Sequence, residues 1–407
     1  MNIRALTGFL DPGWPLDPRR IGALAACMKT AQAALQEAGY PVQSLRFATP
    51  PPAEMDRPVP VDRREELARQ LEAECFVHGV DYACIGPTLP EEPRAYSAVP
   101  EILAATENIF VSGLIADSED GLSLSAVRAC AQAIVDASTI SPDGFANLRF
   151  AALACVPPGA PFFPAAYHAG GPPALALAAE AAELAVDALR DVTAPPTARR
   201  RLIGMIDAHA AALTRLIQPI ADENQIHYLG LDFSLAPYPD PLRSVGTALE
   251  AFGLSAVGGP GTLAAAAFLT DCLDRAQFRR TGFNGLMLPV LEDSVLAARV
   301  ADGHLTLRDL LVLSSVCGTG LDTIPLPGSV TPETLAGVLA DVGALALRLD
   351  KPLTARLMPI PGRSAGDEVH FDFPYFADSR IMSLPEDPLR GMLAEAGLLE
   401  LGPRPVE

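Results

Sequence analysis

Short apolar runs alternate with amphipathic stretches along most of the chain. The apolar residues between positions 18 and 39 are three and four apart, which predicts a helix. Asp17 can cap the start of this helix, Pro18 suits its first turn, and Gly39 ends it. Helical patterns also run from Asp62 toward His78 and through residues 127–134. Apolar runs predict strands at residues 42–47, 82–85, 109–114, 150–156, 228–233, 286–290 and 354–359. This alternation is typical of parallel strands covered by helices, in an α/β barrel or a doubly wound sheet.

An alanine-rich stretch from Ala174 to Leu189 predicts further helices. Three acidic residues interrupt it, so we interpret these helices as buried layers and not as membrane spans. Prolines cluster at residues 50–52, 157–158 and 195–196, which indicates loops and a division near residue 195. We therefore expect two halves, residues 1–195 and 196–407.

Composition narrows the classes of partner and compartment. The 407 residues carry a formal charge of −19 with a pI near 4.7, so we expect neither a nucleic-acid nor a membrane partner. The seven cysteines are odd in number and include no C-x-x-C pair, which fits neither a disulfide framework nor a zinc ribbon. The first residues lack a secretory leader pattern. We expect a cytoplasmic protein.

Cys317 lies in the segment Ser314 to Asp322, between small residues and close to a carboxylate. Its neighbours Gly318 and Gly320 favour an exposed thiol that acts as a nucleophile or redox group. The alternative is a small buried apolar residue, the commonest fate of a free cysteine. His168, in a glycine-bounded loop, is a candidate general base, with a structural histidine as the alternative.

Other residue types indicate anion binding. A predicted helix follows a glycine-rich segment made of Gly258, Gly259, Gly261 and Thr262. The free amides at this helix start can bind an anion. The alternative is that the glycines allow close packing of the chain. Arg46 and Arg356 lie near strand or loop ends and can grip a carboxylate or phosphate, or form structural ion pairs.

Carboxylates follow two predicted strands. Asp232 and Ser234 end the strand 228–233, where they bind a ligand or cap a turn. Glu292 and Asp293 follow the strand 286–290, where they complement a helix dipole. Together, Asp232, Glu292 and Asp293 are also candidate ligands for a divalent metal.

These motifs together resemble a family of bacterial and archaeal proteins called domain of unknown function 711 (DUF711), or uncharacterised protein family 0210 (UPF0210). The resemblance is most specific after residue 231, and the similar segments are 232–237, 244–245, 258–262, 289–293, 316–322, 327–328 and 354–367. Earlier similarity includes Arg46 with Thr49 and Tyr167 with His168. It therefore covers most of the chain.

The resemblance implies a single domain over residues 1–407, a ten-stranded α/β barrel similar to pyruvate formate-lyase (PFL-like). Two five-stranded parallel halves would enclose a loop that carries Cys317. It also adds Thr49 to the substrate-binding candidates. The C-terminal glycine motif of the radical enzymes of that architecture is absent from the sequence, so we expect no self-contained glycyl-radical mechanism.

Three functions remain open from the sequence. The first is an enzyme, assembled as a homo-oligomer, that acts on a small anionic metabolite with Cys317 as the reactive group and His168 or Asp322 handling the proton. The second is a metabolite-binding or regulatory oligomer without catalysis. The third is a metal-dependent hydrolase built on Asp232, Glu292 and Asp293. No cofactor is indicated.

Overall fold

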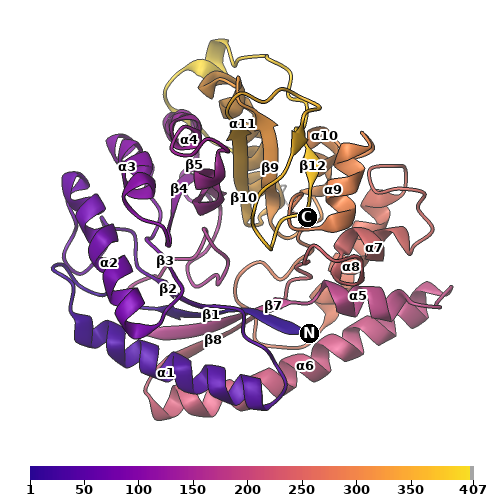
Figure 1. Cartoon of the computed structure of the whole chain (residues 1–407), viewed down its shortest axis with the longest axis horizontal. Helices are drawn as coiled ribbons and strands as arrows, with labels where there is room; N and C mark the ends of the chain where they lie inside the picture. The colour runs from indigo at the N-terminus through magenta and orange to yellow at the C-terminus, as the bar shows by residue number, and fades with distance from the viewer. Residues whose placement is uncertain (404–407) are drawn as a thin grey trace.

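The computed structural model describes residues 1–403 and has an α/β architecture with a large, mostly parallel sheet. Helices form an outer ring around the strands (Figure 1). The strands are β1 (Asn2–Phe9), β2 (Leu45–Ala48), β3 (Tyr82–Cys84), β4 (Ile109–Asp117), β5 (Gly121–Ser123), β6 (Phe150–Ala154), β7 (Ala174–Glu180), β8 (His227–Asp232), β9 (Gly320–Pro327), β10 (Leu353–Ile360), β11 (Glu368–Val369), β12 (Ser379–Arg380) and β13 (Leu398–Leu399).

Eleven α-helices connect these strands in the described part of the chain. They are α1 (Pro18–Glu37), α2 (Arg64–His78), α3 (Ala98–Ala105), α4 (Leu124–Ser138), α5 (Ala182–Leu189), α6 (Pro195–Glu223), α7 (Val245–Glu250), α8 (Thr262–Arg275), α9 (Ser294–Ala301), α10 (Leu307–Leu313) and α11 (Pro332–Leu349). Asp17 caps α1 by accepting from the Arg19 amide, which confirms the predicted start. No helix within residues 1–403 is both long enough and apolar enough to cross a membrane.

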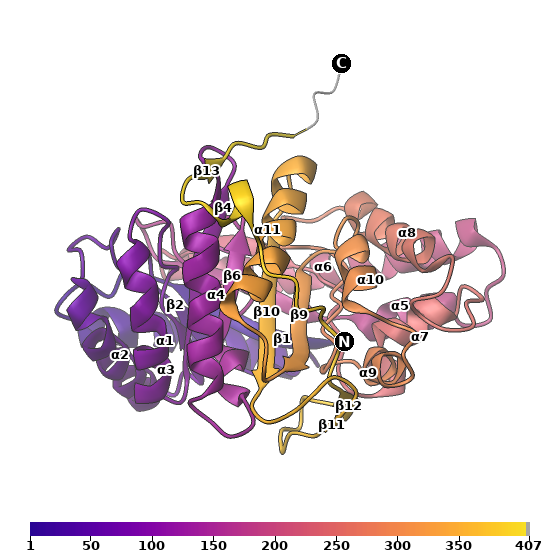
Figure 2. The ribbon, with the colours of Figure 1, turned by 90° about the horizontal axis from the view of Figure 1, so that it is seen from above.

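The main sheet has the strand order β8-β7-β1-β2-β3-β4-β6-β10-β9. The five strands β1, β2, β3, β4 and β6 are parallel. Two parallel pairs, β7 with β8 and β9 with β10, flank them in the opposite direction. The direction therefore changes between β6 and β7, whereas residue 195 is the start of α6. The small pairs β11–β12 and β5–β13 lie at opposite ends of the molecule (Figure 2).

The two end strands of this order, β8 and β9, both contact the segment 280–289. Single parallel bridges join Leu231 to Arg280, Leu235 to Leu286, and Pro289 to Asp322. The predicted strand at 286–290 is thus reduced to isolated bridges. Within residues 1–403 the continuous ladder has nine strands along its path and does not close, so the expected ten-stranded barrel is not confirmed.

The alanine-rich stretch 174–189 contains the clearest error of secondary-structure prediction. Its second part is helix α5, but residues 174–180 form strand β7. Alanine favours helices in isolation. Here the run lies between β1 and β8 and is buried over its whole length, so sheet pairing and close packing override that preference. Strand β9 was also missed, because its residues read as a glycine-rich loop.

Candidate ligand-binding pocket

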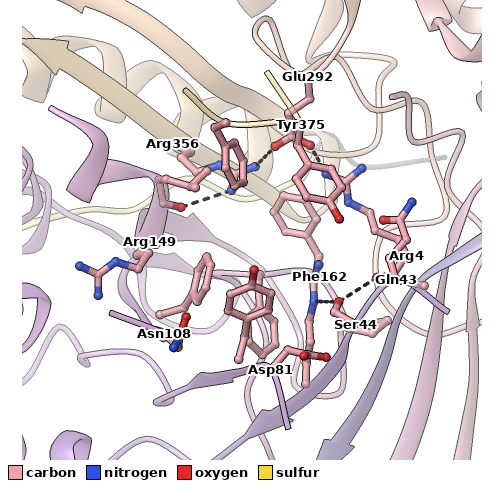
Figure 3. A pocket seen from close by; sticks show the side chains of 18 of the residues that line it. Arg4, Gln43, Ser44, Asp81, Asn108, Arg149, Phe162, Glu292, Arg356 and Tyr375 are labelled. Atoms are coloured by element: carbon pink, nitrogen blue, oxygen red, sulfur yellow. Dashed lines mark hydrogen bonds and ion pairs between the residues drawn. The ribbon is translucent and has the colours of Figure 1, made fainter. Parts of the chain in front are cut away.

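The concave side of the sheet faces a central pocket of about 510 Å³. Its lining includes one or more residues from each of seven strands: Arg4 of β1, Arg46 of β2, Tyr82 of β3, Phe110 of β4, Ala178 of β7, Asp232 of β8 and Arg356 of β10. Loop residues complete the walls, among them Phe162 and Tyr375 (Figure 3). Parts of the chain far apart in sequence therefore present their side chains to one cavity.

A buried chain of ion pairs crosses one wall of the pocket (Figure 3). Glu292 binds two arginines, since one carboxylate oxygen pairs with Arg4 and the other accepts from Arg356 Nη2 at 2.9 Å. Arg356 Nε also donates to Asp322 at 2.6 Å. All four residues are buried or mostly buried. Two positive and two negative charges alternate, so this network is neutral as a unit.

The pKa values of the two carboxylates diverge. Burial alone would raise the pKa of Glu292, but the charges of Arg4 and Arg356 outweigh it, so this pKa lies below its ordinary value. Burial raises the pKa of Asp322 above its ordinary value, against the opposing charge of Arg356. Glu292 is therefore the firmly ionised member of the network.

Arg46 is a pocket arginine without a carboxylate partner among residues 1–403. Its Nε donates to Ser44 Oγ at 2.9 Å. Its guanidinium carbon lies 5.1 Å from the ring centroid of Phe163 and 6.0 Å from that of Tyr82. Burial, assisted by the like charge of Arg4, lowers the pKa of Arg46 to about 10. This positive charge faces the cavity without a counterion.

The fourth pocket arginine, Arg149, is used differently. Its guanidinium donates to the carbonyls of Leu103 and Ile109 at 2.7 and 3.2 Å. These bonds tie the end of α3 to the start of β4, so Arg149 supports the wall. The rest of the lining is rich in rings, and its aromatic members are Tyr82, Phe110, Phe145, Phe162, Phe163, Phe373 and Tyr375. Its described residues include no cysteine, histidine or lysine.

Comparison with known proteins decides the family. The profile of the family described as "Uncharacterised ACR (DUF711)" matches residues 15–377. The chain belongs to the DUF711 family. It is similar to a UPF0210 protein of Pyrobaculum islandicum, at 32% identity over 395 residues that cover 90% of this chain and 87% of that protein. A UPF0210 protein of Methanopyrus kandleri is 31% identical and covers 90% of this chain, with 88% of its own length matched. A third, from Syntrophobacter fumaroxidans, is 31% identical, covering 82% of this chain and 77% of that protein.

The structure of this DUF711 chain brings five of the predicted site residues to the central pocket. They are Arg46, Asp232, Ser234, Glu292 and Arg356. Asp322 lies directly behind them through its pair with Arg356. The Asp232 carboxylate accepts from Ser234 Oγ at 2.5 Å and from the amides of Phe283 and Asn284, and burial still raises its pKa. It therefore orders the start of the segment 283–285.

Cys317 does not line the central pocket of this DUF711 protein. Only 1% of the residue is exposed, and it belongs to the main apolar core. The expected exposure is wrong because the flanking glycines serve packing: a Cβ on Gly318 would lie 2.6 Å from Gly285 Cα, and one on Gly320 would lie 2.4 Å from the Thr354 carbonyl oxygen. Cys317 borders a second cavity of about 370 Å³ that shares no lining residue with the central pocket.

His168 and Thr49 also lie outside the central pocket. His168 is 4% exposed; its Nδ1 accepts from the Gly170 amide at 2.6 Å and its Nε2 donates to the Pro172 carbonyl at 3.1 Å. Thr49 Oγ1 donates to the Pro50 carbonyl and accepts from the Gly86 amide. Both side chains are thus used to hold loops, as the structural alternative for His168 stated.

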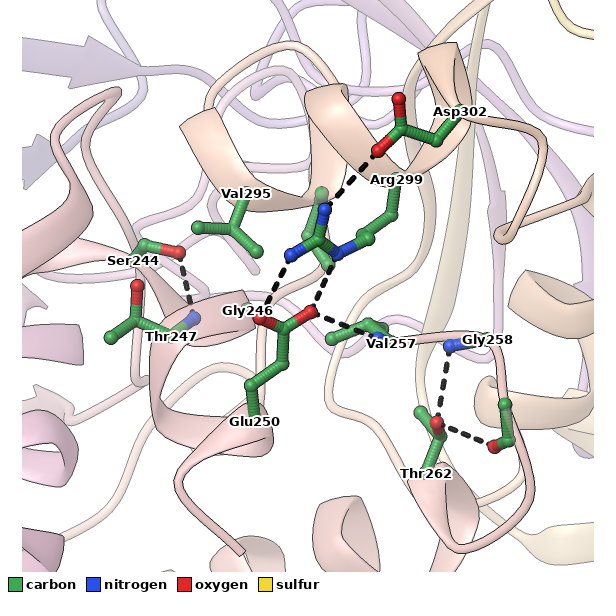
Figure 4. A network of polar contacts seen from close by, with 12 residues as sticks. Ser244, Gly246, Thr247, Glu250, Val257, Gly258, Thr262, Val295, Arg299 and Asp302 are labelled. Carbon is green, nitrogen blue, oxygen red and sulfur yellow. Dashed lines mark hydrogen bonds and ion pairs between the residues drawn. The ribbon is translucent and has the colours of Figure 1, made fainter. Parts of the chain in front are cut away.

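The glycine-rich segment 258–262 closes on itself (Figure 4). Thr262 Oγ1 accepts from the Gly258 amide at 3.1 Å and donates to the Gly259 carbonyl at 2.8 Å. Gly258 has a φ of 100°, and a Cβ there would lie 1.9 Å from the His304 carbonyl oxygen. Close packing explains these glycines, and none of the segment lines the central pocket.

Asp293 caps two helices at once. Its Oδ1 accepts from the Val295 and Leu296 amides at the start of α9 and from Ser244 Oγ. Its Oδ2 accepts from the Val245 and Gly246 amides at the start of α7. With Asp232 and Glu292 bound to other donors, the three proposed metal ligands do not converge. Residues 1–403 contain no group of three or more His, Cys, Asp or Glu side chains placed to hold a metal ion.

Several pocket residues were not predicted from the sequence. Arg4 carries a signal that could have been used, since it is a charged residue inside an otherwise apolar strand. Arg149 and the aromatic side chains carry no such signal. They come from separate loops and strands, and their meeting depends on the tertiary structure.

Proposed function

We propose that this DUF711 protein binds a small organic anion in the central pocket and that Arg46 holds the negative charge. The observation that carries the proposal is the uncompensated guanidinium of Arg46 inside a cavity. Arg46 is half-buried and has no carboxylate partner among residues 1–403, so the partial loss of hydration of its charge has a free-energy cost. A bound carboxylate or phosphate would remove that cost and can accept two parallel hydrogen bonds from the fork.

The remaining arginines support this choice by being already occupied. Arg4 and Arg356 share Glu292, and Arg149 is bonded to main-chain carbonyls. An anion that entered the pocket would have to break an existing ion pair to reach Arg4 or Arg356. Arg46 offers its charge without that exchange.

The proposal is for binding, and it gives Cys317 no chemical role. The described lining of the pocket lacks the thiol that a cysteine-dependent reaction needs, and it also lacks an imidazole and an amine. Of the functions open from the sequence, a metabolite-binding protein is therefore favoured over a cysteine-dependent enzyme.

We also propose that the sheet is the PFL-like barrel that the family resemblance implies, with the segment 280–289 as its tenth member. In support, this segment makes parallel bridges to both end strands. Counted with it, β10, β9, 280–289, β8 and β7 would be a five-membered parallel half. It would face the five parallel strands β1, β2, β3, β4 and β6.

A thermal-shift panel tests the binding proposal. The probes are acetate, benzoate, 3-phenylpropanoate, succinate, inorganic phosphate and phenyl phosphate. We expect one or more of them to raise the Tm of the wild type, because a ligand at 100 times its Kd adds about 2.7 kcal/mol. Arg46→Gln should abolish the shift. Arg69→Gln removes a charge from the exposed pair with Glu65 on α2 and should keep it. A panel without any stabilising anion, or one that stabilises Arg46→Gln equally, refutes the proposal.

A further inference from the structure

We infer that the anion is a monocarboxylate attached to an aromatic ring, and not a phosphate ester or a dicarboxylate. This inference rests on the proposed function, since it takes Arg46 as the anchor of the ligand. It adds two properties of the ligand to that function: its charge, and the chemical nature of the group attached to the carboxylate.

The charge of the pocket lining limits the ligand to one negative charge. Four arginines line the cavity, and so do four carboxylates, Asp81, Glu107, Asp232 and Glu292. With every group ionised the lining has no net charge. Arg4 and Arg356 are paired with carboxylates, and Arg149 is bonded to main-chain carbonyls. Arg46 is therefore the arginine open to one carboxylate, while a second negative charge would meet occupied arginines and acidic side chains.

Asp81 places one of these acidic groups at the start of the strand that pairs with the strand of Arg46. It directly precedes Tyr82, whose Cα is paired with that of Arg46 in the sheet. Its Oδ2 accepts from the Leu45 amide at 2.7 Å, next to Arg46 in the chain. A phosphate dianion would bring a second negative charge into a lining that already holds this carboxylate, whereas a planar monocarboxylate brings one charge and fits the guanidinium fork.

Three aromatic rings surround the anchor and define the body of the ligand. The guanidinium of Arg46 lies near Phe163 and Tyr82. Phe110 contacts both of those rings edge-on, with centroids 5.3 and 5.6 Å apart. A ring that extends from an Arg46-bound carboxylate would meet this cluster in the edge-to-face geometry that aromatic groups prefer.

The size of the cavity supports a ligand larger than a simple acid. A volume of about 510 Å³ is in the range of pockets that enclose drug-sized molecules. Formate or acetate would leave most of the aromatic wall in contact with water. A carboxylate joined to a ring by a short chain would cover it.

Isothermal titration calorimetry at neutral pH tests this inference with matched probes. We expect 3-phenylpropanoate to bind about tenfold or more tightly than succinate, phenyl phosphate and the uncharged 3-phenylpropanamide. It should bind about three- to tenfold more tightly than 3-cyclohexylpropanoate, which keeps the carboxylate but lacks the π faces. Arg46→Gln should remove the preference for the acid over the amide. The ligand comparisons need no variant, so they hold even if a substitution disturbs folding.

The outcomes separate the two levels of the argument. If phenyl phosphate or succinate binds more tightly than 3-phenylpropanoate and Arg46→Gln abolishes it, the proposed anion site stands and the aromatic monocarboxylate is refuted. Equal binding of the phenyl and cyclohexyl acids also refutes it. If no probe binds the wild type, or if Arg46→Gln binds them all as well, the proposed function itself fails.

Discussion

Arg356 and Glu292 form an ion pair of 2.9 Å although they are 64 positions apart, and both are nearly inaccessible to solvent. Glu292 also pairs with Arg4, which is 288 positions away near the N-terminus. The pair therefore joins the N-terminal strand β1, the loop before α9 and strand β10 around the pocket. Arg46, in contrast, has no carboxylate partner among residues 1–403.

Replacement of Glu292 by Gln should strongly destabilise the protein. The variant leaves Arg4 with a neutral acceptor and Arg356 with Asp322 as its remaining carboxylate, and breaking a buried pair costs about 3–5 kcal/mol. Urea unfolding measures the change. Glu65→Gln breaks the exposed pair with Arg69 and should cost under about 1 kcal/mol. Equal losses in the two variants would contradict the proposed importance of the buried network.

Asp293→Ala should cost about 2–4 kcal/mol, because it removes the cap of α9 and also the acceptor of the first two α7 amides, although Ser244 still caps α7. A single cap is worth about 1–2 kcal/mol. The matched control is Thr306→Ala, which removes one exposed cap from α10. Its expected cost is about 1 kcal/mol. Anion affinity should not change in a folded Asp293→Ala protein, since Asp293 does not line the pocket. A large loss of affinity would argue for a direct role.

Cysteine reactivity should follow exposure in the folded protein. Cys155 is the half-buried cysteine, whereas Cys317 and the other five are buried. A thiol reagent followed by peptide mass analysis should therefore label Cys155 first and Cys317 only on unfolding. Cys317→Ala should keep anion binding. Rapid labelling of Cys317, or protection of it by a bound probe, would restore the cysteine-dependent hypothesis.

His168 should make the protein less stable as the pH falls below about 6.5. Burial lowers the pKa of His168, against the opposing effects of the Pro172 carbonyl and Asp11. The unfolded chain then takes up a proton that the folded protein resists. Above the unfolded pKa both states are neutral and the effect vanishes. His168→Asn can keep the acceptor for the Gly170 amide without this titration. The advantage of wild type over variant in unfolding free energy should thus shrink between about pH 7 and 5, and a constant difference would contradict this.

Local signals predicted the helices better than the sheet. Asp17, Pro18 and Gly39 set the ends of α1 through capping, which depends on neighbours in sequence. Strand β7 was read as helix because alanine preference is a local property, while its pairing with β1 and β8 is not. The predicted strand at 286–290 is reduced to isolated bridges within segment 280–289, and the three bridges of this segment depend on residues far away in sequence.

The candidate site was predicted only in part, because some of its residues carry a local signal and others meet only through long-range contacts. Arg46, Asp232 and Arg356 were identified from their positions near strand ends, and they do line one cavity. Cys317 was misplaced because glycine next to a cysteine indicates either exposure or close backbone packing, and only the contact with Gly285 distinguishes them. The binding roles of Arg46, Asp232 and Arg356 remain predictions.

The most direct test of the account is a crystal structure with 3-(4-bromophenyl)propanoate, in which anomalous scattering locates the bromine. We expect the carboxylate within hydrogen-bonding distance of the Arg46 guanidinium and the bromine among the pocket aromatic rings. Bromine density in the cavity beside Cys317, or a carboxylate bound away from Arg46, would contradict it.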